Sequence, residues 1–383
     1  MNLDLTDDQR QMRDLVREFA TNEVEPGAAE RDRNQIFPLE VVKKMGELGL
    51  FGLPIPQDFG GLGADALTWA LVMEELGHAD SSVAVTLSVA SGLAGGMVVR
   101  YGTSEQQERW LPPIAAGEML AGFALTEPSG GSDVRALRTT ARLEDGSWTI
   151  DGSKAFITNS GTPITGFLVV ACRTDDPPRG VSTIIVPADT DGLVIGSEYE
   201  KMGWRSTDTH EVVLQGCRVP EANLLGERGR GLRQCLASLD DGRISIAAIS
   251  VGLAQACLDA SLRYAQEREA FGRPIGSFEA VAFKLADMRA SIEAARLLTY
   301  AAAWTKDQGR DYSAAAAAAK LRASDVANVC ARDAIQIHGG YGYTEEFPVS
   351  RYYRDAKILE IGEGTSEILR LVIARDMGLS LDL

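Results

Sequence analysis

The residue pattern best suited to acid–base chemistry lies in residues 361–367 (IGEGTSE), where Glu363 stands between two glycines. Glycine costs a helix interior about 1 kcal/mol relative to alanine, so this pattern favours a turn whose backbone approaches a ligand closely. Thr365 or Ser366 can cap the helix that the apolar spacing of the next residues predicts. A carboxylate on such a turn is a candidate general base, although the segment alone also fits a solvated loop acid.

Two glycine-rich segments are candidates for binding an anion or a cofactor. In residues 124–133 (ALTEPSGGSD), glycine N–H groups can approach an anion, and Thr126 and Ser132 can donate to a phosphate or a ring heteroatom. Residues 336–343 (QIHGGYGY) follow a predicted helix and precede the segment 351–355 (RYYRD). A Gly/Ser turn and a helix C-cap are the alternative interpretations of these two segments.

The elements that must position these residues form three stretches that differ in residue pattern. The first, residues 1–119, is predicted to be helical, because apolar residues recur at helical intervals. Thr6 with Gln9, and Ser104 with Gln107, have the form of a capping box, which predicts a helix start at each. Two further runs predict apolar helices, at 64–77 and 81–101.

Residues 120–225 change to short β-branched segments separated by Gly, Pro, Asn and Asp clusters, which is the spacing of strands. The predicted strands are 148–150, 155–158, 167–171, 181–186 and 211–214. No long helix alternates with them, so the pattern predicts an antiparallel β-domain and not a doubly wound nucleotide fold. Residues 226–231 (GERGRG) have glycines in the wrong order for a G-x-G-x-x-G fingerprint and are interpreted as a loop leading into a helix.

The remainder of the chain returns to helical periodicity. Three long stretches rich in Ala and Leu are predicted, at 244–266, 278–307 and 313–337. With the short helix after Thr365 they predict a four-helix bundle. The predicted fold class is mainly α with a middle β-domain: an N-terminal helical domain at 1–119, an antiparallel β-domain at 120–225 and a C-terminal bundle at 226–383.

The composition excludes several classes of partner. A net charge of −16, with 45% apolar and 24% charged residues, is typical of a soluble globular protein and argues against nucleic acid or an anionic membrane surface. No apolar run approaches the roughly 20 residues of a membrane span, and the chain start lacks the basic region of a secretory signal, so a cytoplasmic protein is expected. Five widely spaced cysteines and three scattered histidines suggest neither a disulfide framework nor a metal site.

Together, these segments resemble the acyl-CoA dehydrogenase family. Residues 124–136 match one family signature and residues 336–355 match the other. Similar joining pieces occur at 201–205 (KMGWR), 268–272 (REAFG) and 283–288 (FKLADM). The similarity runs essentially from end to end, and it implies an FAD-dependent flavoprotein with the three-part fold predicted above.

The resemblance implies that FAD is contacted from two parts of the chain. In the middle domain the contacts are Phe123, Leu125, Thr126, Gly131, Ser132, Phe156, Ile157 and Thr158. From the C-terminal domain, reaching FAD across a subunit interface, they are Arg268, Phe271, Gln336, Gly339, Gly340, Thr365 and Glu367. This sharing implies a dimer at least, and family precedent favours a homotetramer built from two dimers.

The resemblance also implies α,β-dehydrogenation of an acyl-CoA thioester, in which Glu363 removes the Cα proton and a hydride leaves Cβ for the flavin. Glu363 matches the base position of short- and medium-chain enzymes, whereas Gly242 holds the place where other members carry the base. Positions that line CoA or the thioester are matched by Ser132, Asp240, Arg243 and Gly364. Arg243 equally fits a salt bridge, and Asp240 and Asp241 are interpreted as residues of a helix start and a ligand loop.

The acyl carrier and the electron acceptor stay open at this point. One alternative is the same chemistry on an acyl group tethered to a carrier protein. Another is an oxidase, monooxygenase or nitroalkane oxidase on the same fold, and a non-enzymatic scaffold would be colourless. Electron-transferring flavoprotein is the usual acceptor in the family.

Gly362 is the clearest departure beside the expected base. Many short- and medium-chain relatives carry a tyrosine there, and its ring narrows the cavity around the acyl Cα and Cβ. Without the ring we expect a branched or otherwise bulkier acyl group, unless a neighbouring aromatic such as Tyr341 or Phe123 fills the space.

Overall fold

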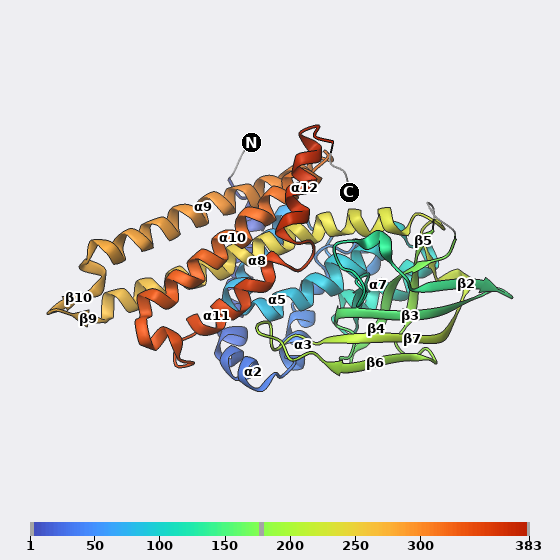
Figure 1. Ribbon diagram of the computed structural model, residues 1–383, viewed down its shortest axis with the longest axis horizontal. Helices are drawn as coiled ribbons and strands as arrows, with labels where there is room; N and C mark the ends of the chain where they lie inside the picture. Colours follow the sequence, from blue (N-terminus) through green and yellow to red (C-terminus); the bar gives the residue numbers. More distant parts are fainter. Residues whose placement is uncertain (1–3, 176–179, 381–383) are drawn as a thin grey trace.

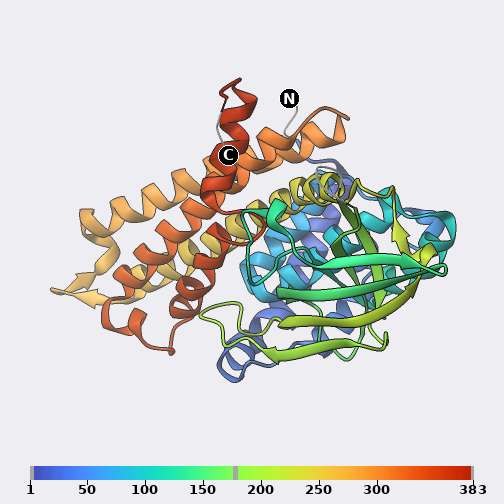
Figure 2. The ribbon, with the colours of Figure 1, turned by 45° about the vertical axis from the view of Figure 1, so that its right-hand side comes forward.

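The computed structural model describes residues 4–175 and 180–380. Residues 1–3, part of the chain start considered above for a secretory signal, lie outside the described residues. Figure 1 shows the β-sheet at one end of the molecule and the long C-terminal helices reaching away to the other end. Figure 2, turned by 45°, shows the N-terminal helices behind the sheet, so the three stretches pack side by side.

The first stretch is helical, as predicted. Its α-helices are α1 (Asp7–Phe19), α2 (Ala28–Asn34), α3 (Leu39–Glu47), α4 (Ala66–Ala79), α5 (Ser81–Leu87), α6 (Gly96–Tyr101) and α7 (Ser104–Ala115). A π-helical segment, Ser88–Gly95, joins α5 to α6, so the apolar run at 81–101 is continuous.

The predicted capping boxes are half right. Thr6 and Gln9 form the box that starts α1. At α7 the prediction was wrong by one residue, because Thr103 and Gln106 form the box and Ser104 is already helical. The sequence TSEQQ fits both registers, and the extended backbone of Thr103 decides between them.

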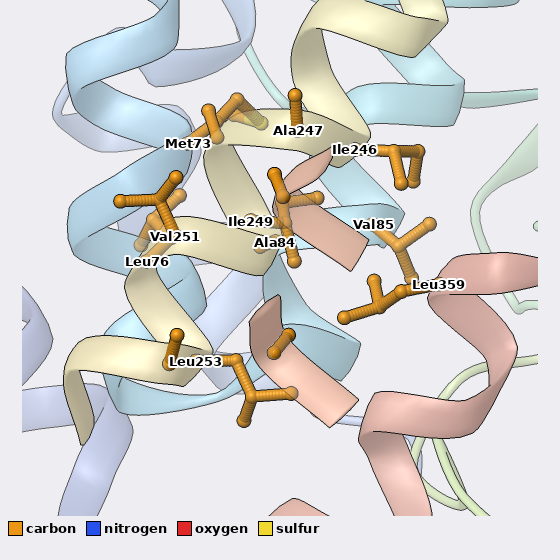
Figure 3. Packing of buried hydrophobic residues seen from close by; sticks show 14 of the residues in the cluster. Met73, Leu76, Ala84, Val85, Ile246, Ala247, Ile249, Val251, Leu253 and Leu359 are labelled. Carbon is orange, nitrogen blue, oxygen red and sulfur yellow. The ribbon is translucent and has the colours of Figure 1, made fainter. Parts of the chain in front are cut away.

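Two described helices correct the expectation that no apolar run approaches the length of a membrane span. Residues Ser81–Tyr101 and Gly231–Glu267 are both long and apolar enough by composition, and 83% of the apolar window of each is buried inside the protein. Figure 3 shows Ala84 and Val85 packed near Ile246 and Ile249 in the main core. These segments are therefore core helices of the fold, which pass the same test as a membrane span.

The middle stretch forms an eight-stranded sheet. Its strands are β1 (Leu120–Ala124), β2 (Thr140–Glu144), β3 (Ser147–Thr158), β4 (Thr165–Arg173), β5 (Val181–Pro187), β6 (Leu193–Glu198), β7 (Thr209–Pro220) and β8 (Leu224–Leu225). They pair in the order β6-β7-β3-β2-β4-β5-β8, with β1 beside β4. The segments predicted as separate strands at 148–150 and 155–158 are one strand, β3, with a shift in pairing register after Ile150.

The sheet is antiparallel as predicted in most of its strand pairs, but β1 and β2 both pair with β4 in parallel, which the prediction did not include. The strand β1 follows helix α7 and not a hairpin turn, so nothing local forces it to run against its neighbour. Buried side chains of α7 and β4, among them Trp110, Leu111 and Phe167, join in one cluster that holds the helix against the sheet.

The last stretch is helical again. It contains α8 (Gly231–Glu267), α9 (Glu279–Asp307), α10 (Ser313–His338), α11 (Val349–Ala356) and α12 (Ser366–Asp376), with a small hairpin of β9 (Glu269–Ala270) and β10 (Arg273–Pro274) between α8 and α9. The loop predicted at 226–231 does lead into a helix. However, α8 begins at Gly231, so Asp240 and Asp241 lie inside it and not at a helix start or in a ligand loop.

A buried polar network fixes the segment that leads to the Glu363 turn. Asp355 accepts hydrogen bonds from the backbone N–H of Trp204 at 2.7 Å and from Ser81 Oγ at 3.2 Å. Arg351 lies 3.8 Å from Asp80, which caps α5. The end of α11 is thus tied to both the helical and the β stretches, and the chain emerges from it in one defined direction.

Candidate active site

Glu363 lies on a turn between the short 3₁₀ segment Lys357–Glu360 and α12. Its backbone φ is 55°, in the left-handed region that non-glycine residues rarely adopt, and Gly364 follows with φ of 108°. Thr365 caps α12, since its side chain accepts a hydrogen bond from Ile368 N at 3.4 Å. The predicted turn and one of the two predicted caps are thus present.

The Glu363 residue is half-buried as a whole, but its carboxylate oxygen Oε2 is buried. Its Oε2 atom has no hydrogen-bond partner among the described residues. Burial raises the pKa of Glu363 to about 7, against the opposing charges of Lys320 and then Arg243. An acid with an unpartnered oxygen and a pKa near neutrality is suited to take a proton from a bound ligand.

Gly242 on α8 faces this carboxylate directly. A Cβ atom added at Gly242 would lie only 1.9 Å from Glu363 Oε2 and 2.9 Å from its Cδ. Any side chain at this position would therefore displace the Glu363 carboxylate from where it lies. The two positions at which the family is expected to carry its base, 363 and 242, lie next to the same space. In this chain the carboxylate in that space comes from Glu363 on the turn.

Arg243 lies beside the turn and is buried. It pairs with Asp240, whose Oδ1 also accepts from Ser313 Oγ at 3.0 Å, while Arg243 Nε has no partner among the described residues. A Cβ added at Gly364 would lie 3.8 Å from Arg243 Nη2. Arg243 thus makes the salt bridge considered above and keeps one donor free close to the Glu363 turn. The expected roles of Asp240, Arg243 and Gly364 at the substrate stay predictions.

Asp241 is the centre of a polar cluster that the sequence did not reveal. Lys306 Nζ lies 2.8 Å from its Oδ1, and Arg100 and the Tyr312 hydroxyl also bind its carboxylate. These partners come from α6, α9 and the α9–α10 connection, so their meeting depends on tertiary packing. The cluster fixes the stretch of α8 that carries Asp240 and Gly242.

Lys320 is the other residue that sequence analysis missed at the site. Its Nζ donates to the backbone carbonyl of Gly362 at 2.8 Å and to that of Gly364. The available signal was a single lysine directly after the alanine run at 314–319, in a helix that packing buries. Its distance of more than forty positions from Glu363 gave no indication of contact.

The segment expected at the flavin is shaped by a buried ion pair. Glu127 accepts from Lys154 Nζ at 2.9 Å and from the N–H groups of Arg138 and Thr139 at 2.7 and 2.9 Å. These contacts hold a loop on which Gly131 and Ser132 are exposed and Thr126 is half-buried. On β3 Phe156 is 64% exposed, and its ring lies tilted against that of Tyr199 with the centroids 4.8 Å apart. Thr158 is half-buried beside buried Ile157. Of the β1 residues expected there, Phe123 is half-buried, and Leu125, which follows the strand, is buried.

The second glycine segment lines a cavity at the far end of α8 and α10. The cavity has a volume of about 530 Å³, and its walls include Tyr264, Arg268, His338, Gly339, Gly340 and Tyr341. Gly339 has φ of 61°, and a Cβ added at Gly340 would meet no atom within 4 Å. Open glycine backbone beside a guanidinium can bind a phosphate group.

The structure does not bring the two groups of expected FAD residues together within one chain. Figure 1 shows β9 and the end of α10 at one extremity and the sheet at the other. Phe271, at the β9–β10 hairpin, is 97% exposed, and Gln336 and Arg268 are also exposed. Thr365 and Glu367 lie between these ends, at the start of α12. The residue types fit FAD, with open glycines and an arginine for phosphates and an exposed phenylalanine for the ring.

Within residues 4–175 and 180–380, no three His, Cys, Asp or Glu side chains are grouped as they would be to hold a metal ion. All five cysteines are buried and free.

Comparison with known protein families gives three matches that together span most of the chain. Residues 6–118 match the N-terminal domain of acyl-CoA dehydrogenases, residues 122–217 the middle domain and residues 229–378 the C-terminal domain. Two relatives are a probable acyl-CoA dehydrogenase of Bacillus subtilis (strain 168), and the mitochondrial short-chain specific acyl-CoA dehydrogenase of Mus musculus. The Bacillus protein is 48% identical to this chain, over 98% of this chain and 100% of its own length. The mouse protein is 43% identical, over 97% of this chain and 90% of its own length.

Solved structures give the same result. Butyryl-CoA dehydrogenase from Megasphaera elsdenii superimposes with a TM-score of 0.96 at 39% identity, covering 99% of this chain and 100% of its own. A structure described for the electron transferring flavoprotein of Acidaminococcus fermentans superimposes with a TM-score of 0.96 at 42% identity, covering 98% of this chain and 99% of its own. A glutaryl-CoA dehydrogenase from Mycobacterium smegmatis in complex with FADH2 superimposes with a TM-score of 0.94 at 30% identity, covering 99% of this chain and 97% of its own.

Proposed function

Because this chain belongs to the acyl-CoA dehydrogenase family, we propose that it converts an acyl-CoA thioester to the 2-enoyl thioester, with Glu363 taking the proton from Cα. FAD is the cofactor of the family, and when bound it accepts the hydride that leaves Cβ. The observation that carries this proposal is the buried, unpartnered Oε2 of Glu363. Removal of an α-proton needs a base that water does not solvate, and this oxygen meets that need.

The backbone around Glu363 supports a second task, the stabilisation of charge on the thioester oxygen. In the described residues, the N–H of Glu363 donates to no backbone or side-chain acceptor. The N–H groups of Ile361 and Gly362, by contrast, are both satisfied by the carbonyl of Ile358. A free donor beside the base can disperse the enolate-like charge that forms as the proton leaves. Arg243 Nε, also free, adds positive potential to the same region.

The names of the relatives favour a short acyl chain carried by CoA. A Cβ added at Gly362 would meet only Ile358, at 3.6 Å from its carbonyl oxygen and 4.0 Å from its Cγ1, so there is room at this position. Tyr341, considered above as a filler, packs instead against Phe347 and Arg268. We therefore propose a short acyl group that carries a branch near Cα or Cβ.

Gly362→Tyr should penalise branched substrates. We expect kcat/KM for 2-methyl- and 3-methyl-branched thioesters to fall about tenfold or more, since a pocket discriminates a single carbon by that amount, while butyryl-CoA changes less. Octanoyl-CoA completes the panel, and Gly362→Ala, whose Cβ fits without a clash, is the matched control. The branched-substrate proposal fails if wild type prefers the straight chains, or if the tyrosine lowers all rates alike.

Arg268 is proposed to reach FAD from a neighbouring subunit, because it lines the cavity at the far end of α8 from the sheet. Arg268→Ala should weaken FAD binding about 10- to 100-fold, the value of a hydrogen bond to a charged group, and loosen the dimer at the same time. Fluorescence of released flavin and gel filtration measure the two effects. Arg263→Ala, exposed on the last turns of α8 just before Arg268, is the control. Retention of FAD by Arg268→Ala through dilution would place the residue outside the site.

The assembly and the acceptor complete the proposal. We propose a cytoplasmic homotetramer formed by two FAD-sharing dimers, with electron-transferring flavoprotein as the acceptor. The solved structure named for such a flavoprotein in Acidaminococcus fermentans supports the choice of acceptor. Turnover of butyryl-CoA with that acceptor, compared with oxygen consumption and with a butyryl carrier protein as substrate, separates the dehydrogenase from the oxidase and carrier-protein alternatives.

A further inference from the structure

Lys320 holds both ends of the turn that carries Glu363. Its side chain is fully buried on α10, and its Nζ donates to the carbonyls of Gly362 and Gly364, the two neighbours of Glu363. A single ammonium group therefore connects the backbone before and after the base. These partners are carbonyl oxygens and not a carboxylate, so the lysine is not half of an ordinary salt bridge.

A buried ammonium of this kind opposes folding unless it is compensated. Burial lowers the pKa of Lys320 to about 8, and the negative charge of Glu363 is the main effect in the other direction. Lys320 is therefore mostly protonated at neutral pH and carries its charge next to the base. An apolar side chain would fill the same volume without this cost. The buried ammonium must therefore have a role, and its hydrogen bonds indicate that this role concerns the Glu363 turn.

The backbone of the Glu363 turn needs support from outside the turn. Glu363 adopts φ of 55°, which is strained for a residue with a side chain and is kept only where the surroundings impose it. The glycines on either side make the segment flexible when it is unsupported. Hydrogen bonds from one rigid helix to both carbonyls remove that freedom and leave Oε2 at the Gly242 face of α8.

The charges that face Glu363 come from two helices. Lys320 on α10 has the larger effect and Arg243 on α8 the smaller, and both favour the ionised carboxylate against its burial. Arg243 is partly neutralised by its pair with Asp240. Glu360, before the turn, acts on Lys320 and is itself paired with Lys357. Lys320 is thus the main group that opposes the protonation of Glu363 caused by its burial.

We propose that Lys320 is a positioning residue for the reaction, which fixes the turn of Glu363 and favours the charged form of its carboxylate. This inference rests on the proposed role of Glu363 as the base. Lys320 takes no proton from the substrate.

The test is the pH dependence of flavin bleaching by butyryl-CoA under anaerobic conditions, in the FAD-loaded protein. In wild type the rate should rise with pH through about 7, where Glu363 ionises. Lys320→Gln and Lys320→Met remove the charge, so the rise should move to higher pH by about one unit or more, the effect of an opposite charge at close range. The variants should be about tenfold slower than wild type near pH 7 and recover part of the difference at higher pH, with KM changed less than kcat.

Lys357→Gln is the matched control, since it removes an exposed lysine from the segment just before the turn and should leave the profile unchanged. The inference is overturned if Lys320→Gln keeps the wild-type pH profile, or loses rate by the same factor at every pH. It is also overturned if both Lys320 variants fail to fold or to retain FAD, because the role would then be purely structural. Wild-type bleaching with an unshifted profile in the variants rejects this inference alone. Absence of bleaching in wild type by butyryl-CoA and by its 2-methyl- and 3-methyl-branched analogues rejects the proposed function.

Discussion

Glu363→Gln is expected to retain FAD and to be reduced by acyl-CoA about 10²- to 10⁴-fold more slowly than wild type, the range that general-base catalysis supplies. Glutamine keeps the shape of the side chain but cannot accept the Cα proton. The wild-type rate should rise with pH through about 7, because burial raises the pKa of Glu363 to about 7 and only the ionised form is a base. Stopped-flow spectroscopy of the flavin measures both effects.

The thermal stability of Glu363→Gln shows whether its slower reaction comes from loss of the base or from loss of folding. Folding raises the pKa of Glu363 from 4.5 to about 7, so the wild type loses stability as pH rises between these values. Glu363→Gln lacks that loss and should be no less stable than wild type above pH 7 in thermal unfolding. Glu345→Gln, on an exposed loop, should match wild type in rate. Near-normal flavin reduction by Glu363→Gln would remove Glu363 from the mechanism.

Moving the carboxylate from the turn to α8 should restore part of the activity lost on removing Glu363. A Cβ at Gly242 would lie 1.9 Å from Glu363 Oε2, so the two backbones can deliver a carboxylate to nearly the same point. Glu363→Gly clears this space. Adding Gly242→Glu should then raise the rate of flavin reduction about tenfold or more over Glu363→Gly alone, within the range of general-base catalysis.

Two further variants make this exchange specific. Glu363→Gly with Gly242→Gln fills the same space without a base and should stay slow. Gly242→Glu alone should lose activity, because the new side chain would collide with Glu363 and place two carboxylates together. The Cδ2 atom of Leu93, 3.0 Å from the added Cβ, is a flexible end that can move. A double variant that keeps FAD but is no faster than Glu363→Gly would contradict the geometry proposed for the base.

The sequence predicted what depends on local rules. The glycines around Glu363 and the cap at Thr365 act within one turn of chain, and the helical and β textures follow from side-chain spacing. Local rules fail where two registers fit equally, as at Thr103 and Ser104. They also fail for strand direction, because β1 takes its parallel place beside β4 from the packing of α7 and not from its own residues.

The rest of the site could not be predicted because it is assembled across long separations. Lys320 precedes the turn by 42 residues, and only the packing of α10 brings its ammonium to the carbonyl of Gly362. The cluster around Asp241 likewise joins partners from three elements. Asp240 and Asp241 were interpreted as residues of a helix start and a ligand loop because they interrupt the apolar periodicity, although both lie inside α8, where Asp240 bonds to Ser313 of α10.

The most direct test of the central claim is to mix the purified protein with butyryl-CoA without oxygen and follow the absorbance of its flavin. If the chain is an acyl-CoA dehydrogenase with Glu363 as base, the oxidised band should disappear rapidly in wild type, with stoichiometric formation of the 2-enoyl thioester, and persist in Glu363→Gln on the same time scale. A protein without bound flavin, a flavin left oxidised by every short straight or branched acyl-CoA, or equal bleaching in wild type and Glu363→Gln would contradict it.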